Sequence, residues 1–171
     1  NELSAAIGYV PQDAFLFSDS ISNNIKFGLS DIGENSNELM EQAAKDAHIY
    51  DNIVEFDKGF ETVVGERGIT LSGGQKQRVS IARAIIKQPD FLVFDDCLSA
   101  VDTETEDIIL RNLKRIMKGK TSVIISHRIS SLEHADLIIV MNEGKIIEQG
   151  SHDELMNQNG YYTSLNEKQK G

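Results

Sequence analysis

Two adjacent carboxylates, Asp95 and Asp96, directly follow the apolar residues 91–94. The apolar run predicts a buried strand, and the two acids would then stand at its carboxyl end, where open parallel sheets bind ligands. A strand end aims hard oxygen ligands rigidly, as a Mg²⁺ bound to nucleotide phosphates requires. A solvated strand end with a helix-capping acid would look the same, so the pair alone leaves both interpretations open.

A serine and two glycines form a second candidate site in Leu71-Ser-Gly-Gly-Gln75, which precedes a predicted helix over residues 75–87. The Ser72 hydroxyl and the two glycine amides would gather at the positive end of the helix dipole, with no Cβ to obstruct a phosphate. A glycine pair before a helix is usually only a cap or turn. In isolation, this segment therefore favours a structural role.

Three continuous apolar runs, rather than alternating ones, predict strands covered on both faces of a parallel sheet. They are residues 91–94, 122–126 and 137–141. A predicted helix at Thr103–Met117, capped by Asp102 or Thr103, links the first two runs as a parallel crossover. A short strand at residues 6–10 precedes Pro11, and residues 142–149 predict a hairpin at the sheet edge.

The segment between the first strand and residue 89 has a different pattern. Residues 36–53 carry apolar side chains on one helical face, and residues 58–69 are rich in glycine. The end of the chain, residues 152–170, predicts polar helices. We therefore expect an α/β fold in which a helical insertion, residues 13–88, interrupts a core made of residues 1–12 and 89–171.

Composition narrows the classes of function. The chain has 171 residues, with 17 Lys and Arg against 27 Asp and Glu, for a formal net charge of -10. This charge argues against a broad surface for nucleic acid or anionic lipid, so any bound anion needs a local site. The single cysteine, Cys97, can form no internal disulfide, which is typical of proteins in a reducing compartment. We interpret it as a packing residue. No apolar run is long enough to span a membrane, and the start of the chain suggests that it begins inside a domain.

Taken together, the motifs resemble the nucleotide-binding domain of ABC transporters along nearly the whole chain. The signature-like Leu71-Ser-Gly-Gly-Gln75 is followed after 15 residues by a Walker B-like strand ending in Asp95 and Asp96. A D-loop-like Leu98-Ser-Ala-Val-Asp102 and an H-loop-like Ser126-His-Arg128 come next. Tyr9-Val-Pro-Gln12 is similar to the Q-loop, and residues 15–25 and 62–68 look like exporter segments, the latter like the X-loop.

The resemblance implies the fold and the bound groups. The fold would be of the P-loop NTPase type, with residues 1–171 as a partial ABC ATPase domain whose helical subdomain carries the signature motif. ATP and Mg²⁺ would be the cofactors. Two domains would pack head to tail, and the signature residues of one would bind the γ-phosphate of the ATP held by the other; these residues are Ser72, Gly73, Gly74 and Gln75.

The resemblance also implies individual roles at the metal side of the site. Asp95 would hold Mg²⁺ through water, and Gln12 would approach both the metal and the attacking water. His127 would hydrogen-bond the γ-phosphate, and Asp102 would link the two sites of the dimer. Asp96 stands where active members carry a catalytic glutamate.

Two departures from the family pattern matter. The P-loop, G-x-x-x-x-G-K-[ST], is missing, and the near miss Gly119-Lys-Thr121 has Lys114 where the first glycine belongs. We therefore expect a domain without its amino-terminal part, inactive on its own. Asp96 is one methylene shorter than glutamate, which moves the carboxylate back by about 1.5 Å. This points to a weakened site paired with a different subunit, although aspartate could also be a tolerated base.

These features favour the ATPase domain of an ABC exporter at the cytoplasmic face of the cell membrane, with the present segment itself soluble. Its partners would be a second ATPase domain and the coupling helices of a transmembrane domain, not nucleic acid. Phe15, Leu16 and Phe17 could be core residues or the docking surface for those helices. The alternatives are a soluble ABC-type ATPase of DNA repair or translation, and a catalytically weak regulatory half of a heterodimeric exporter.

Overall fold

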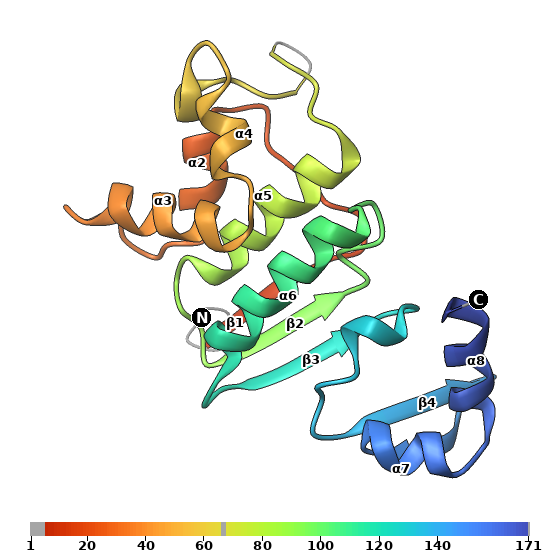
Figure 1. The fold of residues 1–171 in the computed structure, drawn as a ribbon. Coiled ribbons are helices and arrows are strands. Elements are labelled where there is room, and N and C mark those ends of the chain that lie inside the picture. Colours follow the sequence, from red (N-terminus) through yellow and green to blue (C-terminus); the bar gives the residue numbers. More distant parts are fainter. Residues whose placement is uncertain (1–5, 66–67, 171) are drawn as a thin grey trace. The chain divides into compact units, whose positions relative to one another are not determined.

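The computed structural model describes residues 6–65 and 68–170. It divides into two compact units, Asn1–Ile125 and Ser126–Gly171, each with its own hydrophobic core (Figure 1). In the larger unit, α2 (Ile21–Lys26), α3 (Ser36–Asp46) and α4 (Tyr50–Val54) lie at one end and the strands at the other, with α5 (Gly73–Ile85) between them (Figure 1). The predicted division into a helical subdomain at residues 13–88 and a core formed by the rest stays a prediction.

A three-stranded parallel sheet in the order β1-β2-β3 positions the acidic residues. It consists of β1 (Ile7–Val10), β2 (Phe91–Asp95) and β3 (Thr121–Ile125). Leu92 and Phe94 of the central strand are buried, as the apolar run predicted. The prediction that the run at 122–126 is covered on both faces is wrong, because β3 is an edge strand of this sheet and exposes Val123 and Ile125 by 42% and 50%.

The crossover between β2 and β3 is α6 (Thr103–Met117), with the bounds that the sequence predicts. Asp102 caps this helix, since its Oδ1 accepts a hydrogen bond of 2.9 Å from the backbone N–H of Thr105. Glutamates in the first turn stabilise the helix through its dipole, whose positive end they adjoin. Ile109 and Leu113 lie on the apolar face of the helix and are buried.

The helical part of the larger unit differs from the prediction at two points. The periodic stretch at 36–53 is two helices, α3 (Ser36–Asp46) and α4 (Tyr50–Val54), because His48 adopts a left-handed φ of 54° and ends the first. A short helix, α2 (Ile21–Lys26), was not predicted; Ser20 caps it, and Ile21 and Ile25 are buried. The remaining elements are η1 (Gly59–Glu61) and α5 (Gly73–Ile85).

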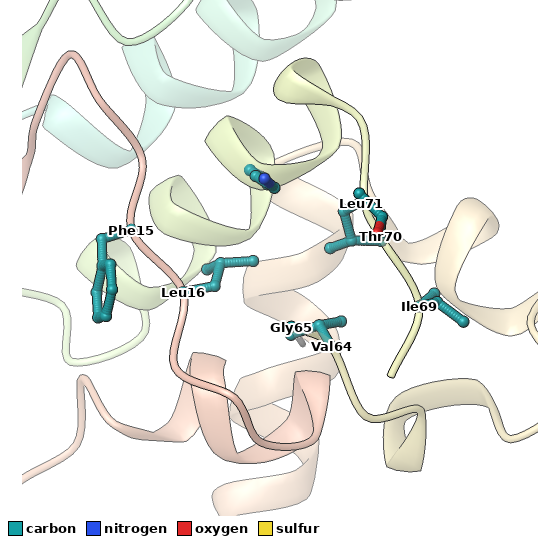
Figure 2. A pocket seen from close by; sticks show the side chains of 8 residues that line it. Phe15, Leu16, Val64, Gly65, Ile69, Thr70 and Leu71 are labelled. Carbon is teal, nitrogen blue, oxygen red and sulfur yellow. The ribbon is translucent and has the colours of Figure 1, made fainter. Parts of the chain in front are cut away.

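A pocket of about 350 Å³ opens between the chain after β1 and the segment before α5. Figure 2 shows Phe15 and Leu16 on one wall, facing the backbone that runs through Val64 and Ile69 to Leu71. In the facing wall, Val64 and Ile69 form an isolated bridge. Glu66 and Arg67, which belong to the predicted X-loop-like stretch, lie outside the described residues.

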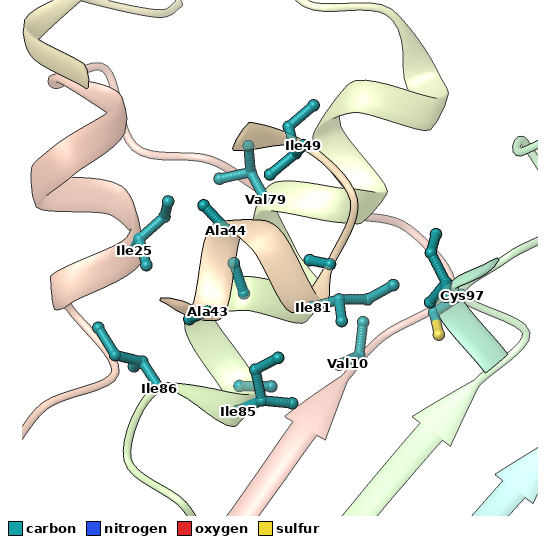
Figure 3. Packing of buried hydrophobic residues seen from close by; sticks show 14 of the residues in the cluster. Val10, Ile25, Ala43, Ala44, Ile49, Val79, Ile81, Ile85, Ile86 and Cys97 are labelled. Carbon is teal, nitrogen blue, oxygen red and sulfur yellow. The ribbon is translucent and has the colours of Figure 1, made fainter. Parts of the chain in front are cut away.

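The core of the larger unit joins its helices to its sheet. Figure 3 shows side chains from four elements converging on one cluster, which contains Val10 of β1, Ile25 of α2, Ala44 of α3, and Val79 and Ile81 of α5. All five are fully buried. The contact between α5 and β1 therefore ties the helical part to the strand that leads to Gln12.

The smaller unit contains a hairpin and two helices. Its strands β4 (Ile138–Asn142) and β5 (Lys145–Gly150) pair antiparallel, so the prediction of a parallel strand at 137–141 is wrong. The turn between them explains the pairing, because Glu143 and Gly144 have φ of 48° and 75°, as a two-residue hairpin turn requires. The predicted hairpin and terminal helices are present, but β4 and β5 form a separate two-stranded sheet, so the prediction that the hairpin lies at the edge of the parallel sheet is wrong. The unit also contains η2 (Ile129–Ser131), α7 (His152–Asn157) and α8 (Tyr161–Lys170).

Within residues 6–65 and 68–170, none of the helices has both the length and the apolar character needed to cross a membrane.

Candidate functional site

The carboxyl ends of β1 and β2 bring three of the predicted site residues together. The parallel register sets Val10 opposite Phe94, so the residues that follow both strands meet at one edge of the sheet. There the Nε2 amide of Gln12 donates a hydrogen bond to Oδ2 of Asp96 over 3.3 Å. Asp95 precedes Asp96 at the end of β2, and both carboxylates are partly accessible. Gln12, Asp95 and Asp96 thus form one polar edge.

Tyr9 is a further member of this edge that the sequence analysis did not single out. Its hydroxyl donates to Oδ2 of Asp95 over 3.3 Å. Desolvation, then the charge of Asp95 and the hydrogen bond to it, raise the pKa of the Tyr9 phenol, so the hydroxyl remains a donor. The strand register pairs Tyr9 with Val93, two residues before Asp95. A prediction of this register would therefore have placed Tyr9 near Asp95.

Asp96 has an unusual backbone. Its φ is 43°, in the left-handed region where aspartate and asparagine are enriched among non-glycine residues. Its N–H donates to the carbonyl of Ile125 over 2.8 Å, which anchors the turn to the end of β3. The direction of the Asp96 carboxylate is therefore set by the turn and by the contact with Gln12.

The donor set at this edge suits a hard cation. Asp95, Asp96 and the Oε1 atom of Gln12 offer the oxygen ligands that Mg²⁺ prefers, while Nε2 of Gln12 is used toward Asp96. Within the part of the chain that the structure describes, no group of three or more His, Cys, Asp or Glu side chains is arranged to hold a metal ion. Any Mg²⁺ here would keep waters and take further ligands from a bound phosphate, as this ion commonly does.

Cys97 follows the acids but points into the core (Figure 3). It is 3% exposed, and burial raises its pKa to about 12, with smaller contributions from the charges of Asp96, Asp95 and Glu106. The thiol is therefore protonated at neutral pH and unreactive. The interpretation of Cys97 as a packing residue is consistent with this burial.

The serine-glycine segment begins α5, two residues earlier than the predicted start of that helix. Ser72 and Gln75 form a capping box: Ser72 Oγ accepts from the Gln75 N–H over 3.2 Å, and Gln75 Oε1 accepts from the Ser72 N–H over 2.9 Å. Ser72 and Gly73 are exposed. An exposed helix amino terminus offers backbone N–H groups to an anion.

The two glycines are not equivalent. A Cβ on Gly74 would lie 2.8 Å from the carbonyl oxygen of Ala100, whereas one on Gly73 would only touch the Ala100 Cβ at 3.4 Å. Gly74 is thus required by packing against the chain after Asp96. Gly73 is open to solvent, so its missing side chain leaves room for a ligand.

Asp102 is at the start of α6, and His127 is in the smaller unit. The Asp102 carboxylate is occupied as the cap of α6; its pKa is lowered by the bonds from Thr105 and, less strongly, by the charge of Arg78. His127 belongs to the smaller unit, where its carbonyl accepts a hydrogen bond of 2.7 Å from Nε2 of Gln169. The roles predicted for these two side chains stay predictions.

Phe15, Leu16 and Phe17 divide between core and surface, and the docking role of the exposed residues stays a prediction. Leu16 packs on the core, whereas Phe15 and Phe17 are 64% and 38% exposed. Phe17 lies between Phe15 and Phe27, with ring centroids 5.2 Å and 4.6 Å apart. These three rings form an aromatic patch on the surface next to the pocket of Figure 2, which Phe15 also lines.

Comparisons with known proteins identify the family of the chain. A family model described as "ABC transporter" matches residues 1–99. The Bacillus subtilis protein named "Probable multidrug resistance ABC transporter ATP-binding/permease protein YheI" is 47% identical over 170 residues, which are 99% of this chain and 28% of that protein. An "ATP-dependent lipid A-core flippase" of Pseudomonas fluorescens is 48% identical over 160 residues, 94% of this chain and 26% of the flippase.

A solved structure has the same fold. The structure titled "Structure of a bacterial Atm1-family ABC exporter with ATP bound" superposes with a TM-score of 0.91 at 42% identity, over 99% of this chain and 29% of that one. The predicted α/β fold is thereby confirmed. The chain spans about a quarter of the length of the curated relatives it matches.

Proposed function

The chain belongs to the ABC transporter family, and we propose that it forms part of the ATPase domain of an exporter, where ATP binding and hydrolysis drive transport across a membrane. The observation that carries the proposal is the contact between Gln12 and Asp96, which joins the ends of β1 and β2 next to Asp95. A glutamine and two carboxylates at the carboxyl edge of a parallel sheet are suited to a phosphate-bound cation and a water nucleophile.

The residues of this edge have separate roles in the proposal. Asp95 and Oε1 of Gln12 would hold Mg²⁺, which would supply positive charge to the phosphates of ATP. The Tyr9 hydroxyl fixes the orientation of the Asp95 carboxylate. Asp96 accepts a proton from the attacking water, and the amide of Gln12 orients that water. His127 hydrogen-bonds the γ-phosphate.

The amino terminus of α5 acts on a neighbouring domain. Ser72, Gly73, Gly74 and Gln75 bind the γ-phosphate of ATP held by a second ATPase domain that packs head to tail, and Asp102 links the two sites. The exposure of Ser72 and Gly73, together with the openness around Gly73, supports this role. An anion at a helix amino terminus also gains from the dipole.

The aromatic patch and the adjacent pocket connect the domain to the membrane part. A coupling helix of a transmembrane domain inserts apolar side chains between Phe15 and the chain at Ile69. This arrangement sets the domain at the cytoplasmic face of a membrane. The same family includes soluble ATPases of DNA repair and translation, but the aromatic patch and the net charge of -10 favour a protein partner over nucleic acid.

A catalytically weak half of a heterodimeric exporter is favoured by one specific feature. Asp96 lacks the methylene that would bring a glutamate carboxylate closer to the water. In this form of the proposal, the intact Ser72–Gln75 segment completes the partner's active site, while the site that contains Asp96 turns over slowly.

The test uses the full-length protein, with its partner subunit where it has one, in lipid. Asp95→Asn and Gln12→Ala should each lower Mg-ATP hydrolysis by about tenfold or more, because each removes an oxygen ligand or the water-orienting amide. Asp90→Asn is the matched control, since Asp90 precedes the same strand but is exposed and outside the site. Equal activity of the Asp95 and Asp90 variants would contradict the proposal.

A further inference from the structure

The Gln77 side chain joins α5 to the segment that follows Asp96. Gln77 is 5% exposed. The nitrogen and the oxygen of its side-chain amide each form a hydrogen bond with a residue more than twenty positions away in the sequence. Its Nε2 donates to Oγ of Ser99 over 3.3 Å, and its Oε1 accepts from the N–H of Ala100 over 3.1 Å. A buried amide with both ends bonded fixes a single relative position of the two segments.

A second contact lies one turn earlier on the same helix. Gly74 comes so close to Ala100 that a Cβ would stand 2.8 Å from its carbonyl oxygen. Positions 74 and 77 are three residues apart and therefore lie on the same face of α5. The backbone of Ala100 is thus held from both sides, by the close approach at its carbonyl and by Gln77 at its N–H.

The segment held in this way, Ser99–Asp102, lies in the chain between the acids of the site and α6. Its first residue bonds back to the acids, since the N–H of Ser99 donates to the carbonyl of Asp96 over 3.3 Å. Leu98 and Val101 are buried, and the Val101 N–H donates to the Leu98 carbonyl over 3.0 Å. The segment ends at Asp102, the cap of α6.

We propose that Gln77 is a positioning residue that makes the Ser72–Gln75 turn and the Ser99–Asp102 segment move as one body. This inference rests on the proposed function, in which the first element contacts the partner's nucleotide and the second lies at the dimer interface. Gln77 fixes the distance between these two elements. Through Ser99, whose N–H bonds to the Asp96 carbonyl, it also affects the position of that carbonyl. Displacements of about 1 Å at such sites change rates by as much as about a hundredfold.

Hydrogen exchange of the Ala100 amide tests the contact without relying on catalysis. In the full-length protein, Gln77→Met should raise the exchange rate of this amide about tenfold, because a methionine of similar shape offers no acceptor. Gln77→Glu retains an oxygen acceptor and should keep the protection. Gln42→Met is the matched control on α3: Gln42 is partly exposed, its side-chain amide bonds to Asp46, and Ala100 should be unaffected.

Steady-state kinetics of the same proteins test the positioning role. Gln77→Met should lower kcat for ATP hydrolysis about tenfold and change KM for Mg-ATP by less than about twofold, since Gln77 touches no nucleotide. Gln77→Glu should recover most of kcat. If Gln77→Met folds and the exchange rate of the Ala100 amide is unchanged, the inference is overturned. If Gln77→Met does not fold, loss of protection of the Ala100 amide in Gln77→Glu overturns it. Absence of ATPase activity in the unmodified protein would instead overturn the proposed function and leave the exchange result valid.

Discussion

The side-chain amide of Gln12 donates to Oδ2 of Asp96 over 3.3 Å, and this bond spans 84 positions of sequence. It joins the residue that leaves β1 to a residue held at φ 43° after β2. Gln12 is followed by the segment that carries Phe15 and Phe17 of the aromatic patch, so we expect this hydrogen bond to be one contact through which a movement of the patch reaches Asp96.

Asp96→Glu in the full-length protein should raise the turnover of the site that contains it by about tenfold to a hundredfold, because the longer side chain brings its carboxylate closer to the attacking water. The free energy of unfolding should fall by about 0.5 to 1 kcal/mol, since glutamate tolerates a left-handed φ less well than aspartate. Single-turnover ATP hydrolysis and chemical denaturation measure the two effects.

Asp96→Asn is the control for this exchange. Its Oδ1 can still accept from Gln12, but the amide takes no proton, so hydrolysis at this site should be lost while the fold is retained. Equal turnover of the aspartate and glutamate proteins would mean that Asp96 is a sufficient base and would remove the argument for a weakened site.

The two glycines of the α5 turn should separate structural from ligand-binding effects. Gly74→Ala should lower the free energy of unfolding by about 1 to 3 kcal/mol, because its Cβ would stand 2.8 Å from the Ala100 carbonyl oxygen. Gly73→Ala should change it by less than about 0.5 kcal/mol, since its Cβ makes only a contact of 3.4 Å. In the full-length protein, Gly73→Ala should nevertheless reduce ATP hydrolysis. Equal stability of the two variants would contradict this assignment.

Cys97 should make stability fall at high pH. Burial raises its pKa from 9.0 to about 12, so the folded protein keeps the proton that the unfolded chain releases. The contribution is complete below pH 9, and it is lost progressively as the pH rises from about 9 to about 12. When the pH is raised from 8 to 10.5, the unmodified protein should lose about 2 kcal/mol more unfolding free energy than the Cys97→Ala variant does.

Urea denaturation at the two pH values gives this difference, because the other titrating groups are common to both proteins. An alkylating reagent at pH 8 supplies an independent readout: the folded protein should react far more slowly than the unfolded one. Identical pH profiles of the two proteins would show that the thiol is not shielded as the structure has it.

Much of the β2 region was predictable because its signals are local. A continuous apolar run specified β2, and a capping residue at 102 or 103 with acids in the next turn specified the start of α6. The helix break at His48 was not predictable, since the left-handed residue there is not glycine. The antiparallel pairing of β4 also escaped prediction, because an apolar run does not identify the partner of a strand. Tyr9 and Gln77 act through contacts that only the register and packing reveal.

Residues 1–171 alone should not bind Mg-ATP with micromolar affinity. The sequence contains no P-loop, and that motif supplies the backbone cradle and the lysine for the β- and γ-phosphates. Isothermal titration calorimetry measures this directly, with the full-length protein as the positive control. Micromolar binding by residues 1–171 would mean that Asp95, Gln12 and the surrounding groups suffice to hold the nucleotide.

Arg83 should be essential for the position of the aromatic patch. Its guanidinium donates to the carbonyl of Phe15, the carbonyl of Asn24 and Oδ1 of Asn24, each over 2.8 Å, and it lies 5.3 Å from the ring centroid of Phe17. Arg83→Lys keeps the charge but lacks the planar set of donors, so about 2 to 3 kcal/mol of unfolding free energy should be lost.

Arg111→Lys is the matched control, since Arg111 is exposed on α6, and it should change the unfolding free energy by less than about 0.5 kcal/mol. In the full-length protein in lipid, Arg83→Lys should also lower the amount of substrate moved per ATP hydrolysed, because Phe15 and Phe17 are no longer held in one position. Basal hydrolysis should change less than transport, since the Arg83 guanidinium bonds to Phe15 and Asn24 and not to the acids of the site. If Arg83→Lys matched Arg111→Lys in both measurements, other contacts, such as the hydrogen bonds between Phe17 and the Asn24 side chain, would suffice to hold the patch, and Arg83 would have no part in coupling.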